Sequence, residues 1–149
     1  MTASGMIWFL VLIHLAILLA ATGWAQRQRL YFELSWGEIL LSILPAGAMV
    51  LSFFALALHM YFSLDGWPRT LGYGDFSMSL ARHARLTLAY FDVIAPATLF
   101  GWPVLVLICA LMGRGRRFIA HLTVYEMAMI GGLLVMMMGP SRFLSWWWD

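Results

Sequence analysis

The sequence has no lysine and few charges of either sign. Charged residues make up 11% of its 149 positions, whereas they make up about a quarter of an ordinary soluble domain. All nine basic residues are arginines, and the net charge of +2 is too small and too dispersed for a nucleic-acid partner. The single cysteine, Cys109, excludes an intrachain disulfide and a metal site built from cysteines alone.

The sequence also lacks the residue patterns of the common catalytic sites. It offers no Ser/His/Asp arrangement, no paired carboxylates, no His/Cys cluster with metal-ligand spacing and no phosphate-binding loop. We therefore expect a protein that is not an enzyme by itself, with no catalytic residue and no metal site.

Long hydrophobic runs are what the sequence has instead. Hydrophobic residues make up 63% of the chain, and four runs reach the about 20 residues that a helix needs to cross a bilayer. These runs are residues 6–25, 39–63, 93–112 and 118–138. The first run lacks a basic segment before it, so we interpret it as a retained span and not as a cleaved signal peptide. The sequence predicts a single all-α integral membrane domain over residues 1–149, built as a four-transmembrane-helix bundle.

The segment of residues 64–92, between the second and third runs, is the one sizeable stretch predicted to lie outside the membrane. After two turns, an amphipathic helix can begin near Ser79, with Leu80, Ala84 and Leu88 on one face. This helix could rest in the membrane interface, or it could run directly into the third span as a longer helix.

The arginines give the orientation of the spans. Five lie in the two short connections and four lie on the opposite side, so the positive-inside rule places the short connections in the cytoplasm. We therefore expect a multi-pass protein of the bacterial inner membrane with both termini in the periplasm. The short basic connection GRGRR is typical of a topological anchor, and its Arg114, Arg116 and Arg117 could also hold an anionic lipid headgroup.

Two of the histidines inside the hydrophobic runs, His14 and His59, are candidates for binding a cofactor. His14 lies in the first run and His59 near the end of the second, and antiparallel spans place both toward the same membrane face. Two neutral imidazoles could bind a haem b iron from both sides, or each could bind the magnesium of a (bacterio)chlorophyll. The alternative is that each histidine hydrogen-bonds to a neighbouring helix.

Small and polar residues at three- and four-residue spacing predict where the helices pack. One such stripe in the second run contains Pro45, Ala48, Ser52, Ala55, His59 and Ser63, and one in the fourth contains His121, Tyr125, Ala128, Gly132 and Gly139. Such stripes allow backbones to approach closely, so we expect both to face inward. Glu126 then points away from its stripe. Because an ionised carboxylate cannot face acyl chains cheaply, we expect Glu126 to contact another subunit.

The segment RLYFELSWGE, followed by a hydrophobic run, resembles the start of the second span in the small four-helix membrane subunit of TRAP transporters. The positions that agree are Arg29, Phe32, Trp36 and Glu38, where an arginine-aromatic segment precedes Trp-x-Glu. The resemblance covers this segment alone and implies a small membrane subunit of a secondary transporter.

Together these features predict a small accessory subunit that scaffolds a larger inner-membrane complex, with other membrane subunits and lipids as partners. An electron-transfer or photosynthetic assembly is the leading host, because methionine- and tryptophan-rich helices pack against cofactors. A cytochrome-like anchor that uses His14 and His59, and a small transporter subunit, are the two alternatives.

The orientation is testable with reporter fusions. Reporters fused after Arg29 and Arg116 should read cytoplasmic, and a reporter fused near Gly74 should read periplasmic, because the arginine excess lies in the two short connections. The inverted pattern would contradict the predicted orientation.

Overall fold

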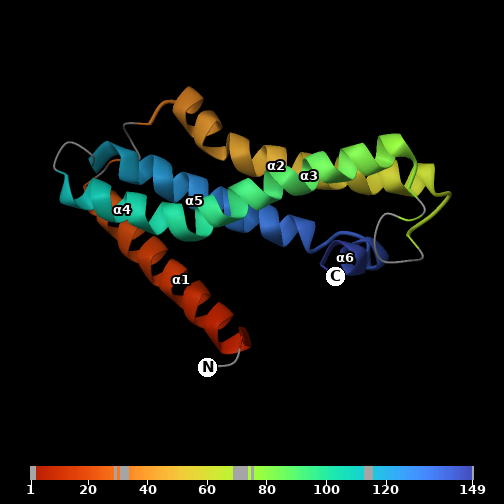
Figure 1. The fold of residues 1–149 in the computed structure, drawn as a ribbon. Helices are drawn as coiled ribbons and strands as arrows, with labels where there is room; N and C mark the ends of the chain where they lie inside the picture. Colours follow the sequence, from red (N-terminus) through yellow and green to blue (C-terminus); the bar gives the residue numbers. More distant parts are fainter. Residues whose placement is uncertain are drawn as a thin grey trace. The chain divides into compact units, whose positions relative to one another are not determined.

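The computed structural model describes residues 3–28, 30, 34–68, 74, 76–112 and 116–148, with side chains from Leu12 onward and without that of Arg116. Over these residues the chain is helical and contains no strand (Figure 1). The elements, in chain order, are α1 (Ala3–Arg27), α2 (Trp36–Ser63), α3 (Met78–Pro96), the π-helix η2 (Ala97–Gly101), α4 (Trp102–Leu111), α5 (Arg116–Met136) and α6 (Ser141–Trp148).

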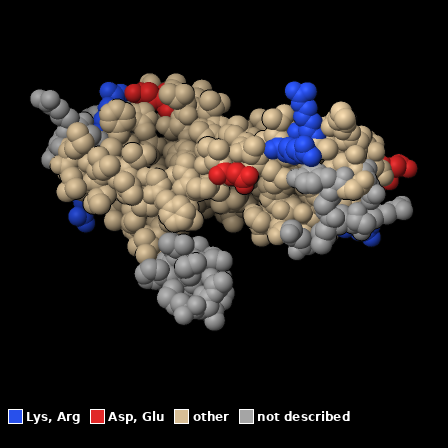
Figure 2. Space-filling view, viewed as in Figure 1, with Lys and Arg blue, Asp and Glu red and all other residues tan. Residues whose placement is uncertain are grey.

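Three helices are long and apolar enough to cross a membrane. They are Trp36–Ser63, Met78–Leu111 and Arg117–Met136, with mean hydropathy of 2.3, 2.1 and 1.6. Uncharged residues make up nearly the whole face seen in Figure 2, and the charged side chains form small, separate groups. The prediction of an all-α membrane protein is confirmed to this extent. Helix α1 matches the first predicted span, but the side chains of residues 3–11 lie outside the described part, so a fourth crossing stays a prediction.

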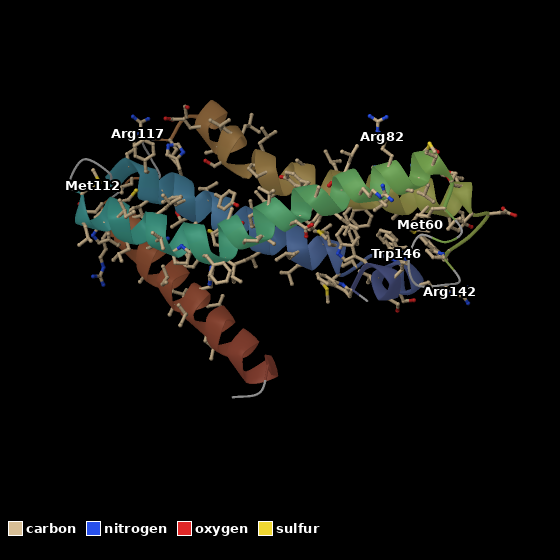
Figure 3. The ribbon with its side chains drawn as sticks, viewed as in Figure 1. Met60, Arg82, Met112, Arg117, Arg142 and Trp146 are labelled. Atoms are coloured by element: carbon tan, nitrogen blue, oxygen red, sulfur yellow. The ribbon has the colours of Figure 1, made fainter. Side chains whose placement is uncertain are left out.

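The third spanning helix has the longer of the two forms that the sequence left open. It starts at Met78 and continues through η2 to Leu111, a length of 34 residues or about 51 Å at 1.5 Å per residue. The amphipathic segment therefore runs into the span as one helix and does not form a separate interfacial one. Leu80 and Ala84 are fully buried on its inner face, and Arg82 projects away from the helix (Figure 3).

By its internal contacts the chain divides into two units. Unit 1 comprises Met1–Leu44 and Ala95–Met127, and unit 2 comprises Pro45–Ile94 and Ala128–Asp149. The core of unit 1 joins three helices through Ala21 of α1, Trp102 and Val106 of α4, and Ile119 of α5. Figure 1 shows α1 and α4 close together near the end of α1.

Aromatic rings form the core of unit 2. Phe53 of α2 is fully buried and makes edge contacts with Phe143 and Trp147 of α6, with ring centroids 4.9 and 5.1 Å apart. Trp147 also meets Phe91 of α3 at 4.7 Å. The short helix α6 therefore holds α2 and α3 together through its rings, which accounts for its place in the core.

The predicted small-residue stripe of α2 is wrong as the inward face. Ala48, Ala55 and Ser63 are exposed, whereas the buried residues of α2 are Ala46, Met49, Phe53, Leu56, Ala57 and Met60. The physical reason is that aromatic packing of Phe53 fixes the rotation of the helix about its axis. Small residues permit a close approach but do not require one.

Gly132 is the stripe residue of α5 that does lie at a close contact. A Cβ atom there would meet Cε of Met49 at 2.9 Å and Cγ2 of Val50 at 3.2 Å, whereas a Cβ on the neighbouring Gly131 would meet no described atom within 4 Å. The two adjacent glycines therefore form a matched pair, one against α2 and one in open space.

This pair gives a test of the packing. Gly132→Leu should lower the free energy of unfolding by about 1 to 3 kcal/mol, because the branched side chain overpacks the contact with Met49 and Val50. Gly131→Leu should be neutral or slightly stabilising, since leucine favours the helix more than glycine does. Unfolding in mixed detergent micelles, followed by circular dichroism, measures both. Equal effects of the two substitutions would contradict the assigned contact.

Candidate functional site

A group of polar residues lies in the interior of unit 1. His14 comes from α1, Thr98 from η2, and Tyr125 and Glu126 from α5. His14 and Glu126 are buried, with 9% and 3% of their surface exposed. Since membrane helices seldom bury ionisable residues without a function, we take these four residues as the candidate site and call them the interior polar cluster.

The π-helix places Thr98 in this cluster. The N–H of Trp102 donates to the carbonyl of Ala97, five residues earlier. In the same register the carbonyl of Thr98 would accept from residue 103, but Pro103 has no N–H. The Thr98 carbonyl is therefore available to a donor outside the helix, and Nε2 of His14 lies 3.4 Å from it. π-helical turns inside α-helices occur often at functional sites for such reasons.

The other contacts of the cluster fix its side chains. The hydroxyl groups of Thr98 and Tyr125 are hydrogen-bonded at 2.5 Å, which joins η2 to α5. The indole N–H of Trp102 donates to the carbonyl of Leu122 at 2.7 Å, and its ring stacks on that of His14 with centroids 5.6 Å apart. Three helical segments are thus joined by polar groups that have no water to bind in a membrane interior.

Glu126 is the group that these contacts leave incomplete. Its Oε2 is closed to solvent and has no hydrogen-bond partner among the described residues. A buried carboxyl oxygen without a hydrogen-bond donor costs folding free energy. Packing alone therefore does not explain a glutamate at this position.

The prediction that Glu126 faces outward is wrong, because its side chain is buried within the chain; its contact with another subunit is not tested and stays a prediction. The inward face of α5 in unit 1 contains Ile119, Ala120, Thr123 and Glu126, whereas His121 and Tyr125 of the predicted stripe are only half-buried. The helix is therefore rotated relative to the prediction, which assumed that small residues mark the interior.

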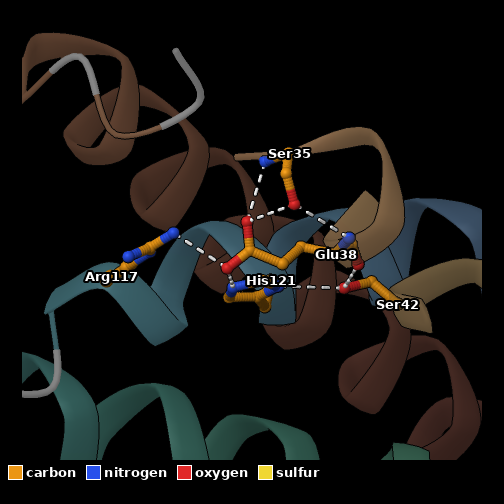
Figure 4. Close-up of polar contacts among 5 residues, drawn as sticks. All are labelled: Ser35, Glu38, Ser42, Arg117 and His121. Atoms are coloured by element: carbon orange, nitrogen blue, oxygen red, sulfur yellow. Dashed lines mark hydrogen bonds and ion pairs between the residues drawn. The ribbon is translucent and has the colours of Figure 1, made fainter. Parts of the chain in front are cut away.

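A second polar group surrounds Glu38 at the start of α2 (Figure 4). The backbone N–H and the hydroxyl of Ser35 donate to Oε2 of Glu38 at 2.7 and 2.8 Å, and the N–H of Glu38 lies 3.3 Å from the Ser35 hydroxyl. This is a capping box, in which the two residues satisfy each other's free backbone groups at a helix start. The spacing Ser-x-x-Glu that produces the capping box is visible in the sequence.

The same carboxylate binds the start of α5. Arg117 donates to Oε1 of Glu38 at 2.8 Å, and Nε2 of His121 lies 3.8 Å from that oxygen. Nδ1 of His121 is hydrogen-bonded to the hydroxyl of Ser42 at 3.1 Å. Figure 3 shows Arg117 near the start of α5. Arg117 was predicted to bind a lipid headgroup; in the structure it forms an ion pair within the chain, and its contact with a headgroup stays a prediction.

The other two arginines predicted at that headgroup site are not described. Arg114 and the side chain of Arg116 lie outside the described residues, so an anionic lipid at the GRGRR segment stays a prediction.

The two histidines predicted to bind a cofactor have separate protein partners. His14 meets the Thr98 carbonyl in unit 1, and Nδ1 of His59 lies 2.8 Å from Nδ1 of His83 in unit 2. Each could bind a haem or chlorophyll metal only through its other ring nitrogen, so ligation by His14 and His59 stays a prediction. Among the described residues no group of three or more His, Cys, Asp or Glu side chains could hold a metal ion.

No protein-family model, no curated protein and no solved structure matches the chain. The interior polar cluster and the Glu38 group must therefore be interpreted from their own geometry.

The Glu38 group gives a test of the local interactions. Ser35→Ala should lower the free energy of unfolding by about 1 kcal/mol, since it removes the N-cap of α2. Arg117→Ala should have a smaller effect, because both partners of its ion pair are partly exposed to solvent. Hydrogen exchange at the amides of the first turn of α2 should accelerate in Ser35→Ala only. Acceleration in Arg117→Ala of the same size would contradict this ranking.

Proposed function

We propose that the chain is a non-catalytic, multi-pass accessory subunit of a larger inner-membrane complex. The observation that supports it best is the outer surface of the helix Met78–Leu111. Only 11% of its most apolar 18-residue window is buried within the chain, against 33% for Arg117–Met136. A helix with so few intrachain contacts has most of its side chains available to a neighbouring subunit.

The residues on this surface follow a seven-residue repeat. Leu86, Val93, Phe100 and Leu107 are spaced by seven and are each more than half exposed. We call these four residues the apolar ridge; Leu86 and Val93, which precede the π-helix, lie within about 20° of one another around a regular α-helix. Lipid tails can cover such exposed apolar side chains, and the helix of a neighbouring subunit can cover them as well.

The host assembly and the orientation remain part of the proposal. An electron-transfer or photosynthetic complex is one host, on the ground that the chain contains 11 methionines and 8 tryptophans. The positive-inside count supports the bacterial inner membrane with periplasmic termini.

The interior polar cluster favours a second candidate function, a membrane subunit of a secondary transporter. Transporters place ionisable residues and interrupted helices inside the membrane, where released backbone carbonyls meet coupling ions. Glu126 and the π-helix with its released Thr98 carbonyl have these two properties. Co-purification with a large carrier subunit would select this candidate, and co-purification with a haem- or pigment-bearing subunit would select the first.

The subunit proposal is tested on the apolar ridge. Val93→Trp and Leu107→Trp should reduce recovery of the complex after mild-detergent extraction about tenfold, which corresponds to about 1.4 kcal/mol, because an indole does not fit a packed helix interface. Leu51→Trp is the control, since Leu51 of α2 is equally exposed and apolar but lies outside the ridge. The amount of complex is measured against the amount of this chain in the membrane. Full recovery with both ridge variants would overturn the proposal.

A further inference from the structure

We propose that His59 and His83 form a proton-binding site in unit 2. The pair takes up one proton, whose charge the two rings share, and a second proton breaks the contact between them. The proposal rests on a direct contact, since the Nδ1 atoms of the two rings lie 2.8 Å apart. It concerns unit 2 alone and does not depend on the subunit function proposed above.

The contact joins two helices through their side chains. His59 belongs to α2 and His83 to α3, and the ring centroids are 5.1 Å apart with the planes tilted by 35°. The distance between the two nitrogen atoms lies within the range of protein hydrogen bonds. One hydrogen atom therefore lies between them, because two bare lone pairs or two N–H groups would repel each other at this distance.

This hydrogen bond requires opposite tautomers in the two neutral rings. The ring that donates carries its hydrogen on Nδ1, so its Nε2 has a lone pair. The ring that accepts carries its hydrogen on Nε2. The pair therefore has one nitrogen that can take up a proton without disturbing the contact, namely Nε2 of the donating ring.

The first added proton makes the two rings equivalent in their bonding. An N–H bond forms at that Nε2, so both rings carry hydrogen on Nε2, and the hydrogen between the Nδ1 atoms can belong to either ring at the same total charge. A hydrogen bond with a charged donor is shorter and stronger than a neutral one. The first proton should therefore tighten the contact of α2 with α3.

The second added proton has a different effect. It can bind only to the remaining Nδ1 lone pair, which is the acceptor of the hydrogen bond between the rings. Two N–H groups and two positive charges then face each other, and the hydrogen bond is lost. The second proton should therefore bind more weakly than the first and should separate the rings.

The surroundings also favour one positive charge on the pair over two. Both rings are half-buried, and the residues next to them along the chain, Met60 and Ala84, are fully buried. Arg82 and Arg85 on either side of His83 are exposed, and the side chain of Arg82 projects away from α3 (Figure 3). Their charges add to the positive potential near the pair, which opposes a second cation more than a first.

The pair lies close to the end of each helix, where protons from water can reach it. His59 is four residues before the end of α2 at Ser63, and His83 is five residues after the start of α3 at Met78. The helix Met78–Leu111 has 34 residues, or about 51 Å at 1.5 Å per residue, whereas the hydrocarbon core is about 30 Å thick. The exposed arginines beside His83 indicate that the first turns of this helix lie beyond that core.

The other titratable and charged groups of unit 2 must be distinguished from the pair. Among the described residues they are Tyr61, Asp65, Arg82, Arg85, Tyr90, Asp92 and Arg142. The hydroxyl of Tyr90 donates to the carbonyl of Pro45 at 2.8 Å, and the part of α5 in unit 2 has no charged side chain. A label confined to histidine keeps all of these groups out of the measurement.

The test is nuclear magnetic resonance of the full chain with nitrogen-15 histidine, purified in detergent micelles, over a pH titration. The wild type should show a scalar coupling between two Nδ1 atoms, because the hydrogen bond joins them. This coupling should persist after the first proton and vanish with the second. Both rings should respond in both steps, and the two midpoints should differ by at least about one pH unit, a tenfold difference in proton affinity.

His83→Phe is the matched variant, since it keeps an aromatic ring and removes the partner nitrogen. His59 should then titrate in a single step without the coupling. His121→Gln is the control, because His121 is a half-buried histidine of unit 1. It should leave the coupling and both midpoints of the pair in place.

Three results would refute the proposed site. They are a wild type without coupling between the rings, a coupling that is lost with the first proton, and rings that each respond in one step only. If His83→Phe does not fold, the coupling in the wild type and its dependence on pH still decide.

Discussion

A helix inside a membrane must satisfy its own backbone, and the helix Met78–Leu111 does not do so at Thr98. The π register assigns its carbonyl to residue 103, where proline has no N–H. Because lipid offers no replacement donor, the donor must come from another helix, and His14 of α1 provides it. The Thr98 hydroxyl is bonded to Tyr125 of α5. One missing N–H group therefore sets the contacts that join η2 to two other helical segments of unit 1.

The Glu38 group meets the same requirement at a helix start, with different consequences. The first turn of α2 has N–H groups without helical acceptors, and Ser35 and Glu38 satisfy part of this need in the capping box. The pair Arg117–Glu38 is added at the surface, where water and salt weaken it. In the interior polar cluster water is excluded, so each hydrogen bond is stronger and each missing one is more costly. Water can satisfy an unpaired carboxyl oxygen at Glu38, but it cannot do so at Glu126. An unpaired oxygen at Glu126 therefore requires an explanation.

The sequence predicted where the helices lie along the chain better than it predicted which face of each helix is buried. Hydrophobic runs are local, so the second span, predicted over residues 39–63, and the fourth, over 118–138, fall within a few residues of α2 and α5. A helix beginning near Ser79 was predicted as well, but the sequence left open whether it lies in the interface or continues into the third span, and the structure shows one helix from Met78. The direction of each helix face depends on residues far away in the sequence. The rings of α6 set the rotation of α2 through Phe53, and no pattern within α2 contains that information.

The candidate site was found in part from its residue types. His14 and Glu126 stood out in the sequence because ionisable residues in apolar runs are costly, but their partners did not. The Ser35–Glu38 spacing and the position of Pro103 five residues after Thr98 are both visible in the sequence. The role of Pro103 could not be inferred from the sequence, because the sequence does not show that the helix adopts the π register there. It also does not show that His14 lies close to the Thr98 carbonyl.

Stability does not explain the carboxyl group at position 126. Apolar side chains of similar volume replace buried charged groups at little cost, or with a gain in stability, in many proteins, and the core of unit 1 beside it is built from residues such as Trp102, Val106 and Ile119. Places where a chain breaks the rule of satisfied buried polar groups are most often places that function requires. Glu126 breaks that rule in the same cluster in which His14 meets a carbonyl that its own helix cannot use, and packing alone explains neither feature.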